Sequence, residues 1–235
     1  MQITIDDIIY QDEVVVAVNK PVDLPIHKND FMPADAEYLT KQVGQLTGLS
    51  VYPVHRLDAK TSGVVILALN RDVAAVLAKQ FEQRTVKKTY LMVCKGIPGE
   101  GAFDNPVLIK KKKKRQSALT KYKTIKTIDT FISYKNDENV SLSLVRAQPE
   151  TGRWHQLRQH LAMNRTDILG DTQHGDWTLN KIMTELTDVK RLLLHATQLE
   201  FLHPVSKQKI SLEAEMPKAF DEVLMQLEGL TYPLV

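Results

Sequence analysis

The chain has very little cysteine, with one residue, Cys94, among 235. A single cysteine excludes an intramolecular disulfide and any zinc site built from several cysteines. It also agrees with a reducing compartment, so we expect a cytoplasmic protein. The His-Glu-x-x-His pattern of metal-binding helices is missing as well, and we expect no metal.

Long hydrophobic runs are missing too. No stretch approaches the roughly 20 apolar residues that cross a bilayer. Residues 1–7 have neither the basic head nor the apolar core of a secretory signal. These absences predict a soluble protein that does not work at a membrane.

The composition is that of an ordinary globular protein, with 43% hydrophobic and 25% charged residues. The formal net charge is only +3, yet residues 110–115 are six consecutive cations. A basic cluster on a mildly basic chain is typical of phosphate binding. A solvated loop is the alternative, and the run by itself leaves both open.

Hydrophobic periodicity predicts more strands than helices and no regular strand-helix alternation. This pattern favours an α+β fold with a mixed, mostly antiparallel sheet, in a single domain over residues 1–235. We expect residues 97–117 to be a long charged connection. Strands are expected at 8–20, 62–69, 88–95, 118–128, 140–147, 192–201 and 208–214, and helices at 37–46, 73–83, 153–163 and 217–227.

The most informative segment is His55-Arg56-Leu57-Asp58-Ala59-Lys60-Thr61-Ser62-Gly63, which precedes the apolar run 64–69. It places a carboxylate among cations on a loop at the edge of a buried strand. Asp58 beside Arg56 should keep a low pKa and stay ionised. That state suits a nucleophile or an electrostatic stabiliser. A structural salt bridge on a turn is the alternative.

This segment resembles a motif of the RluA family of pseudouridine synthases. Other segments resemble further family motifs and follow in the expected order. The likeness spans about residues 8 to 215 and implies the pseudouridine synthase fold. The segments are Asn19-Lys20-Pro21, Lys87-Lys88-Thr89-Tyr90, residues 151–162, Gly170-Asp171, residues 174–176, Leu194-His195-Ala196 and His203-Pro204.

The resemblance implies an isomerase that detaches uracil from ribose in RNA and rejoins it through carbon. No atom is gained or lost, so no cofactor is expected. Asp58 would be the essential carboxylate at the ribose, acting at C1′ or at C2′. Arg158 would pair with Asp58 and fix its rotamer. Tyr90 would stack on the flipped uracil and relay a proton.

Other positions are expected to contact substrate or RNA. Arg56 would fill the gap that the flipped uridine leaves in the RNA stack. Leu157 and Leu194 are candidates for an apolar pocket wall, with ordinary core positions as the alternative. The expected binding residues are Arg56, His55, Thr61, Lys88, Leu157, Leu194, Lys110, Lys112, Lys114 and Arg115, of which His55 and Thr61 also shape the loop.

Residues 10–13, 80–83 and 170–176 narrow the resemblance to short bacterial members that act on tRNA. We therefore expect a tRNA substrate, with ribosomal RNA as the alternative. A non-catalytic RNA-binding or RNA-folding factor is a third reading, although binding alone would not require an acid beside phosphates. A glycosidase is the least supported, since the loop offers one carboxylate instead of two.

The first motif begins within about 20 residues of Met1, so we expect no separate N-terminal RNA-binding domain. We also expect a monomer without an obligate protein partner. One departure concerns Val22-Asp23, which stands where the family usually has glycine two residues after the Lys-Pro pair. Because Asp tolerates unusual backbone, the turn can survive. A substrate role for Lys20 or His27 stays open.

Overall fold

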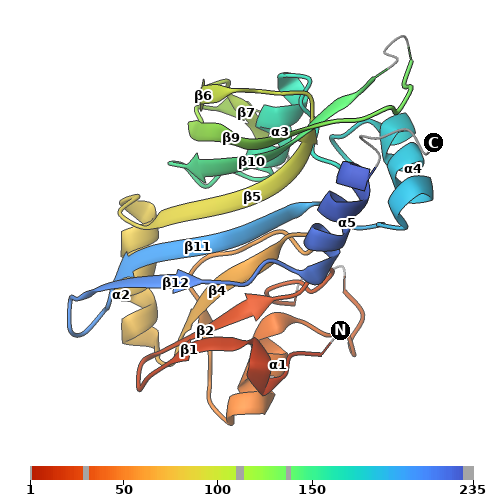
Figure 1. Ribbon diagram of the computed structural model, residues 1–235. Coiled ribbons are helices and arrows are strands. Elements are labelled where there is room, and N and C mark those ends of the chain that lie inside the picture. Colours follow the sequence, from red (N-terminus) through yellow and green to blue (C-terminus); the bar gives the residue numbers. More distant parts are fainter. Residues whose placement is uncertain (1, 29–31, 110–113, 136–138, 230–235) are drawn as a thin grey trace. The chain divides into compact units, whose positions relative to one another are not determined.

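The computed structural model describes residues 2–28, 32–109, 114–135 and 139–229. The chain divides into two compact units. The first unit comprises Met1–Lys88 and Ala196–Glu215, and the second comprises Thr89–His195 and Met216–Val235. Each unit combines helices with a sheet whose neighbouring strands are mainly antiparallel, which confirms the predicted α+β class (Figure 1).

The sheet of the first unit has the strand order β1-β2-β4-β11, with β12 beside β11 and β3 beside β4. The pairs β1–β2, β2–β4, β3–β4 and β11–β12 are antiparallel. The first two residues of β11 belong to the second unit. The elements are β1 (Ile8–Gln11), β2 (Val15–Lys20), α1 (Leu39–Thr47), β3 (Tyr52–Pro53), β4 (Ser62–Ala68), α2 (Arg71–Glu82), β11 (Leu194–Leu202) and β12 (Lys209–Glu213).

Strand β4 is buried at every position. A strand covered on both faces reads as a continuous apolar run, and this explains the sequence 64–69. Val64 and Ile66 pack in one cluster with Val73 and Leu77 of α2. Asn70 caps that helix, because its side chain accepts the Val73 N–H. The strand and helix predicted here are confirmed.

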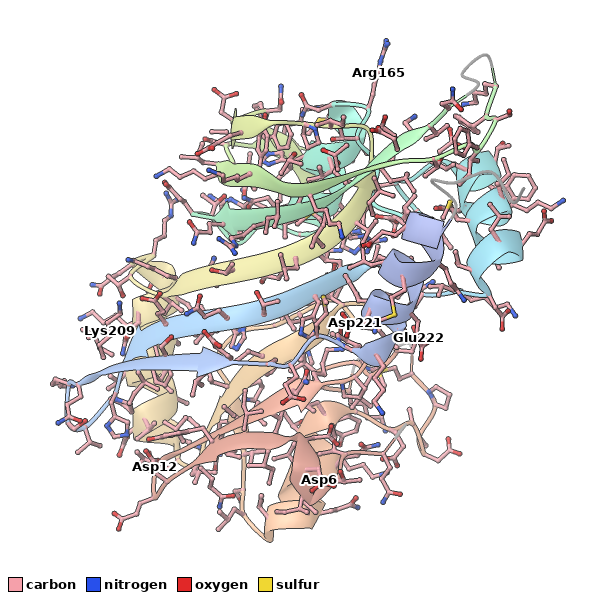
Figure 2. The ribbon with its side chains drawn as sticks, in the orientation of Figure 1. Asp6, Asp12, Arg165, Lys209, Asp221 and Glu222 are labelled. Atoms are coloured by element: carbon pink, nitrogen blue, oxygen red, sulfur yellow. The ribbon has the colours of Figure 1, made fainter. Side chains whose placement is uncertain are left out.

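The single strand predicted over residues 8–20 is wrong, because β1 and β2 form a hairpin. Asp12 turns the chain, and its Oδ1 accepts the N–H groups of Val14 and Val15 at 2.8 and 2.7 Å. Figure 2 labels Asp12 at this end of the two strands. An aspartate that bonds the backbone two or three residues ahead is a usual turn former.

The sheet of the second unit has the order β5-β10-β9-β6, all antiparallel, and β7 pairs with β8 separately. The first two residues of β5 belong to the first unit. The elements are β5 (Lys87–Lys95), β6 (Glu100–Phe103), β7 (Val107–Ile109), β8 (Lys114–Gln116), β9 (Thr120–Asp129), β10 (Ser141–Pro149), α3 (Gln156–Met163), α4 (Trp177–Thr187) and α5 (Lys218–Gly229).

Among the described residues of this unit, one apolar cluster packs on each side of β5. Val93 packs in a cluster with side chains of α4 and α5, including Leu179 and Phe220. Met92 and Cys94 pack in a second cluster that contains Leu161 of α3. Successive side chains of a strand alternate between faces, so β5 separates α3 from the other two helices.

The structure differs from the sequence prediction at three places in this unit. Residues 97–117 contain the strands β6, β7 and β8, which are too short and too charged to show clear alternation. Helix α4 was not predicted, although Asp176 caps it by accepting the Leu179 N–H. Helix α3 begins only after His155, whose φ of 49° is left-handed.

Candidate functional site

In the first unit, the Asp58 loop joins β3 to β4. The Thr61 N–H donates to the Asp58 carbonyl at 3.0 Å, which closes a tight turn directly before the buried strand. Asp58 is half-buried, the preceding Leu57 is buried and Arg56 is exposed. Along the loop, Asp58 therefore follows an exposed cation and a buried apolar residue.

Gly63 explains how closely this loop is held. Its φ is +117°, and a Cβ atom there would lie 2.1 Å from the Ala196 carbonyl oxygen of β11. Only glycine permits this backbone approach. The loop end is thus fixed to the sheet of the first unit.

Lys20 is fully buried and does not reach the surface of this unit. Its Nζ donates to the carbonyl oxygens of Pro21, Leu24 and Ala59 at 2.7, 3.0 and 3.0 Å. The Ala59 contact ties the first-motif turn to the Asp58 loop. Asp23 has a left-handed φ of 58°, so the backbone takes the conformation that a glycine would favour there.

His55 and Thr61 also lie within this loop. The His55 ring stacks on Phe81 with centroids 4.6 Å apart, and its Nε2 accepts the Ile66 N–H at 3.0 Å. Desolvation and the nearby Lys88 charge lower the pKa of His55 to about 3. Desolvation, with Arg84, also lowers the pKa of Lys88 to about 8. Thr61 is buried. These contacts give His55 a loop-shaping position.

In the second unit, Arg158 and Asp171 form a buried ion pair with two parallel hydrogen bonds. Arg158 Nε donates to Asp171 Oδ2, and Nη2 donates to Oδ1, both at 2.7 Å. Desolvation opposes ionisation of Asp171, but the bonds from Arg158 and from the Gln173 N–H leave its carboxyl pKa below the usual value. Sequence reasoning did not name Asp171 as a partner of Arg158, although Gly170-Asp171 was among the family segments.

Tyr90, Leu157 and Leu194 come together in the second unit. Leu157 and Leu194 are buried in the cluster that contains Met92, and the half-buried Tyr90 packs against that cluster. Tyr90 lies opposite Ala147 of β10. Its ring therefore has apolar neighbours, as a base-stacking role and a core role would both require.

The basic residues near β8 and β9 differ in their partners. Lys114 and Arg115 are exposed on β8, where Arg115 Nη1 donates to the Pro106 carbonyl at 3.1 Å. Lys110 and Lys112 lie outside the described residues. On β9, by contrast, each lysine contacts a carboxylate: Lys121 meets Glu150 at 2.7 Å, Lys123 meets Glu100 at 2.8 Å and Lys126 meets Glu228 at 2.5 Å.

The predicted site residues are shared between the two units. Asp58, Arg56, His55, Thr61 and Lys88 belong to the first unit. The pairing of Asp58 with Arg158 stays a prediction. The residues of the second unit are Tyr90, Leu157, Arg158, Leu194, Lys114 and Arg115.

The described residues include one cysteine, Cys94, which is buried. Within them, no three His, Cys, Asp or Glu side chains gather as a metal site requires. Burial raises the pKa of the Cys94 thiol to about 12. No helix in the described part of the chain has the length and apolar character of a membrane span.

Comparison with known proteins shows to which family this chain belongs. The model of the family described as RNA pseudouridylate synthase matches residues 14–163. The chain is 35% identical to tRNA pseudouridine synthase C of Vibrio vulnificus (strain CMCP6), covering 94% of this chain and 95% of that one. It is 38% identical to tRNA pseudouridine synthase C of Pasteurella multocida (strain Pm70), covering 88% and 89%.

A solved structure agrees with these relatives. Human RNA Pseudouridylate Synthase Domain Containing 4 superposes with a TM-score of 0.71 at 29% identity, over 94% of this chain and 93% of the human chain. The fold and the family predicted from the motifs are both confirmed. The chain belongs to the RNA pseudouridylate synthase family and is an isomerase that acts on RNA.

Proposed function

We propose that this enzyme converts a specific uridine of tRNA to pseudouridine and that Asp58 is its essential carboxylate. The observation that carries the proposal is the anchoring of the Asp58 loop. Lys20 ties its backbone to the first-motif turn, and Gly63 fixes its end against β11. A loop held on two sides can aim one carboxylate at a ribose with little reorganisation. The names of two similar proteins support tRNA as the substrate.

Asp58 acts in its ionised form, whether it attacks C1′ or removes a proton at C2′. The exposed Arg56, two residues earlier, favours that charge state by its positive charge. Its guanidinium also stacks in the space that the everted uridine leaves. Such stacking offsets part of the few kcal/mol that unstacking a nucleotide costs.

Arg158 and Tyr90 serve the same reaction from the second unit. The guanidinium of Arg158 is held by two bonds to Asp171, so its direction is fixed before substrate binds. We propose that it pairs with Asp58. Tyr90 packs against the cluster that contains Leu157 and Leu194 and offers its aromatic face to the flipped uracil, and its hydroxyl relays the proton at C5.

The Asp58→Asn variant tests the role of this carboxylate. Tritium release from 5-³H-uridine tRNA should fall below detection, because the amide neither attacks nor accepts a proton. Affinity for tRNA should stay within a few-fold. The matched control is Asp72→Asn at an exposed position of α2, which should keep full activity. Turnover by Asp58→Asn at the wild-type rate would refute the assignment.

The substrate is tested separately by mapping pseudouridine in total RNA from cells with and without this gene. Loss of one signal in tRNA supports the proposal. Loss in ribosomal RNA instead would move the same chemistry to the alternative substrate. No lost signal would favour a non-catalytic RNA-binding factor.

We further propose that residues 1–235 act as a single catalytic domain and as a monomer, in the cytoplasm and without an obligate protein partner. Sedimentation of the purified chain at micromolar concentration should give one species of monomer mass. A dimer, or activity only after addition of a cell extract, would overturn this part.

A further inference from the structure

Arg158 takes part in a closed ring of hydrogen bonds that contains two histidines of the second unit. Arg158 bonds Asp171 through Nε and Nη2, and its Nη1 lies 3.0 Å from His155 Nε2. His155 Nδ1 lies 2.9 Å from His174 Nε2. The ring closes because Asp171 Oδ1 accepts the His174 backbone N–H at 3.0 Å.

The direction of each bond follows from the chemistry of the partners. A guanidinium only donates, so His155 Nε2 must be an unprotonated acceptor. The proton of a neutral His155 is then on Nδ1 and is donated to His174 Nε2. His174 Nε2 is therefore also an acceptor, and a neutral His174 carries its proton on Nδ1. The bond from Arg158 to His155 and the bond from His155 to His174 thus hold each imidazole in one tautomer.

The backbone and the neighbouring ring fix His155 in this place. His155 has φ 49° and ψ 30°, a left-handed conformation that a residue other than glycine adopts rarely. Its ring stacks on Trp154, with centroids 3.8 Å apart and planes 18° apart. Strained backbone of this kind gathers at functional sites, where the surroundings enforce it.

We propose that His155 is a positioning residue for the isomerisation. It holds Nη1 of Arg158 in the orientation that meets substrate or its catalytic partner. Asp171 fixes one edge of the guanidinium and His155 fixes the third nitrogen. His174 orients the His155 ring in turn. This inference rests on the proposed function, since it assumes that Arg158 serves the reaction.

Three substitutions at His155 separate positioning from a backbone role. Gln places an amide oxygen near the position of Nε2 and can still accept from Arg158. Asn reaches only to the position of Nδ1 and cannot accept from Arg158, but it is the side chain that best tolerates a left-handed backbone. Phe keeps the stacking on Trp154 and accepts no bond.

The expected order of kcat is wild type, then His155→Gln within about five-fold, then His155→Asn and His155→Phe lower by roughly 50-fold. KM and the dissociation constant for tRNA should change less than about three-fold, because the reacting geometry is affected more than RNA binding. A purely structural role predicts the reverse order, with Asn more active than Gln. That order, or wild-type kcat in all three, overturns the proposal.

The second measurement uses the unaltered protein, so a variant that does not fold cannot leave the question open. Long-range ¹⁵N–¹H spectra of the imidazoles should show His155 and His174 neutral at about pH 7.5, each with the proton on Nδ1. A proton on Nε2 of His155 refutes the proposal.

An Arg158→Gln variant distinguishes a failure of the proposed function from a failure of the positioning inference. If Arg158→Gln retains full activity, the proposed role of Arg158 fails. If Arg158→Gln is inactive while His155→Asn has a higher kcat than His155→Gln, only the positioning inference fails.

Discussion

Arg158 and Asp171 hold each other by two bonds of 2.7 Å, and both side chains are almost completely buried. Two charges removed from water are stable together only when their geometry is good, and removing one leaves the other without compensation. The sequence separation is only 13 residues, but the chain between them leaves α3 and passes Ile168, which bridges to Cys94 of β5.

The Asp171→Asn variant should be less stable than wild type by about 3 kcal/mol, because the buried guanidinium of Arg158 loses the carboxylate charge that it bonds through Nε and Nη2. Urea unfolding followed by circular dichroism measures this change. Adding Arg158→Met to Asp171→Asn should recover roughly 1–3 kcal/mol relative to the sum of the two single variants. The exposed pair Lys123–Glu100 is the control, and Glu100→Gln should change the urea midpoint little. Strict additivity of the two buried changes would contradict the pairing.

Gly63→Ala should destabilise the first unit severely, because the added Cβ would lie 2.1 Å from a carbonyl oxygen and 2.6 Å from a nitrogen of Ala196. The Ala196 backbone cannot move aside as a flexible side chain can, and a φ of +117° is strained for alanine in any case. We expect a loss of about 3 kcal/mol or more, or failure to recover folded protein.

Gly152→Ala is the matched control for this glycine, since a Cβ there meets no atom within 4 Å. Its urea midpoint should be close to that of wild type. Equal midpoints for the Gly63 and Gly152 variants would show that β4 and β11 can separate at Ala196 without loss.

Local patterns predict much of the fold because they depend only on neighbours in sequence. The apolar run of β4 and the one-sided apolar spacing of α2 are of this kind, and both were predicted within a few residues. The Asp12 hairpin was missed because Val14–Val18 continues the apolar pattern of β1 across the turn. A side-chain bond to the backbone, not hydrophobicity, breaks the strand there.

For the candidate site, the sequence offered residue types and motifs but not contacts. Asp58, Tyr90 and Arg158 were chosen from the ordered family motifs, and their roles stay predictions. The ion pair of Arg158 with Asp171 and the ring through His155 depend on how α3 meets the loop after it, which no periodicity reports. Likewise, the burial of Lys20 against three carbonyls reverses the usual expectation that lysine lies at the surface.

The stability of the protein should fall between about pH 6.5 and pH 5 because of His55. Its pKa is about 3 in the folded protein against 6.5 for the free imidazole, so the unfolded chain binds more protons in this interval. Because only the unfolded chain takes up a proton at His55 in this interval, the free energy of unfolding falls as the pH falls. We expect a loss of about 1 kcal/mol, allowing for the solvent-accessible part of the ring.

His55→Gln tests this pH dependence, because the amide can replace Nε2 as an acceptor for the Ile66 N–H without titrating. The difference in unfolding free energy between the two pH values should shrink by about 1 kcal/mol relative to wild type. His27→Gln at an exposed position serves as the control and should leave the difference unchanged. A variant at His55 that keeps the full pH dependence would assign it to other groups.

RNA affinity should depend on where cations are removed and not only on how many. Replacing Lys110, Lys112 and Lys114 by Ala should weaken tRNA binding and reduce the slope of log K against log salt, by up to about 0.7–0.9 for each phosphate that is no longer neutralised.

Replacing Lys121, Lys123 and Lys126 is the matched control, because it removes the same charge from β9, where each ammonium group already contacts a carboxylate. This second triple variant should change the slope less, because those carboxylates compete with phosphate for the lysines. Filter binding at several salt concentrations measures both. Equal slopes for the two triple variants would mean that net charge alone attracts the RNA, and an unchanged slope for the first would mean that these lysines do not contact RNA phosphates.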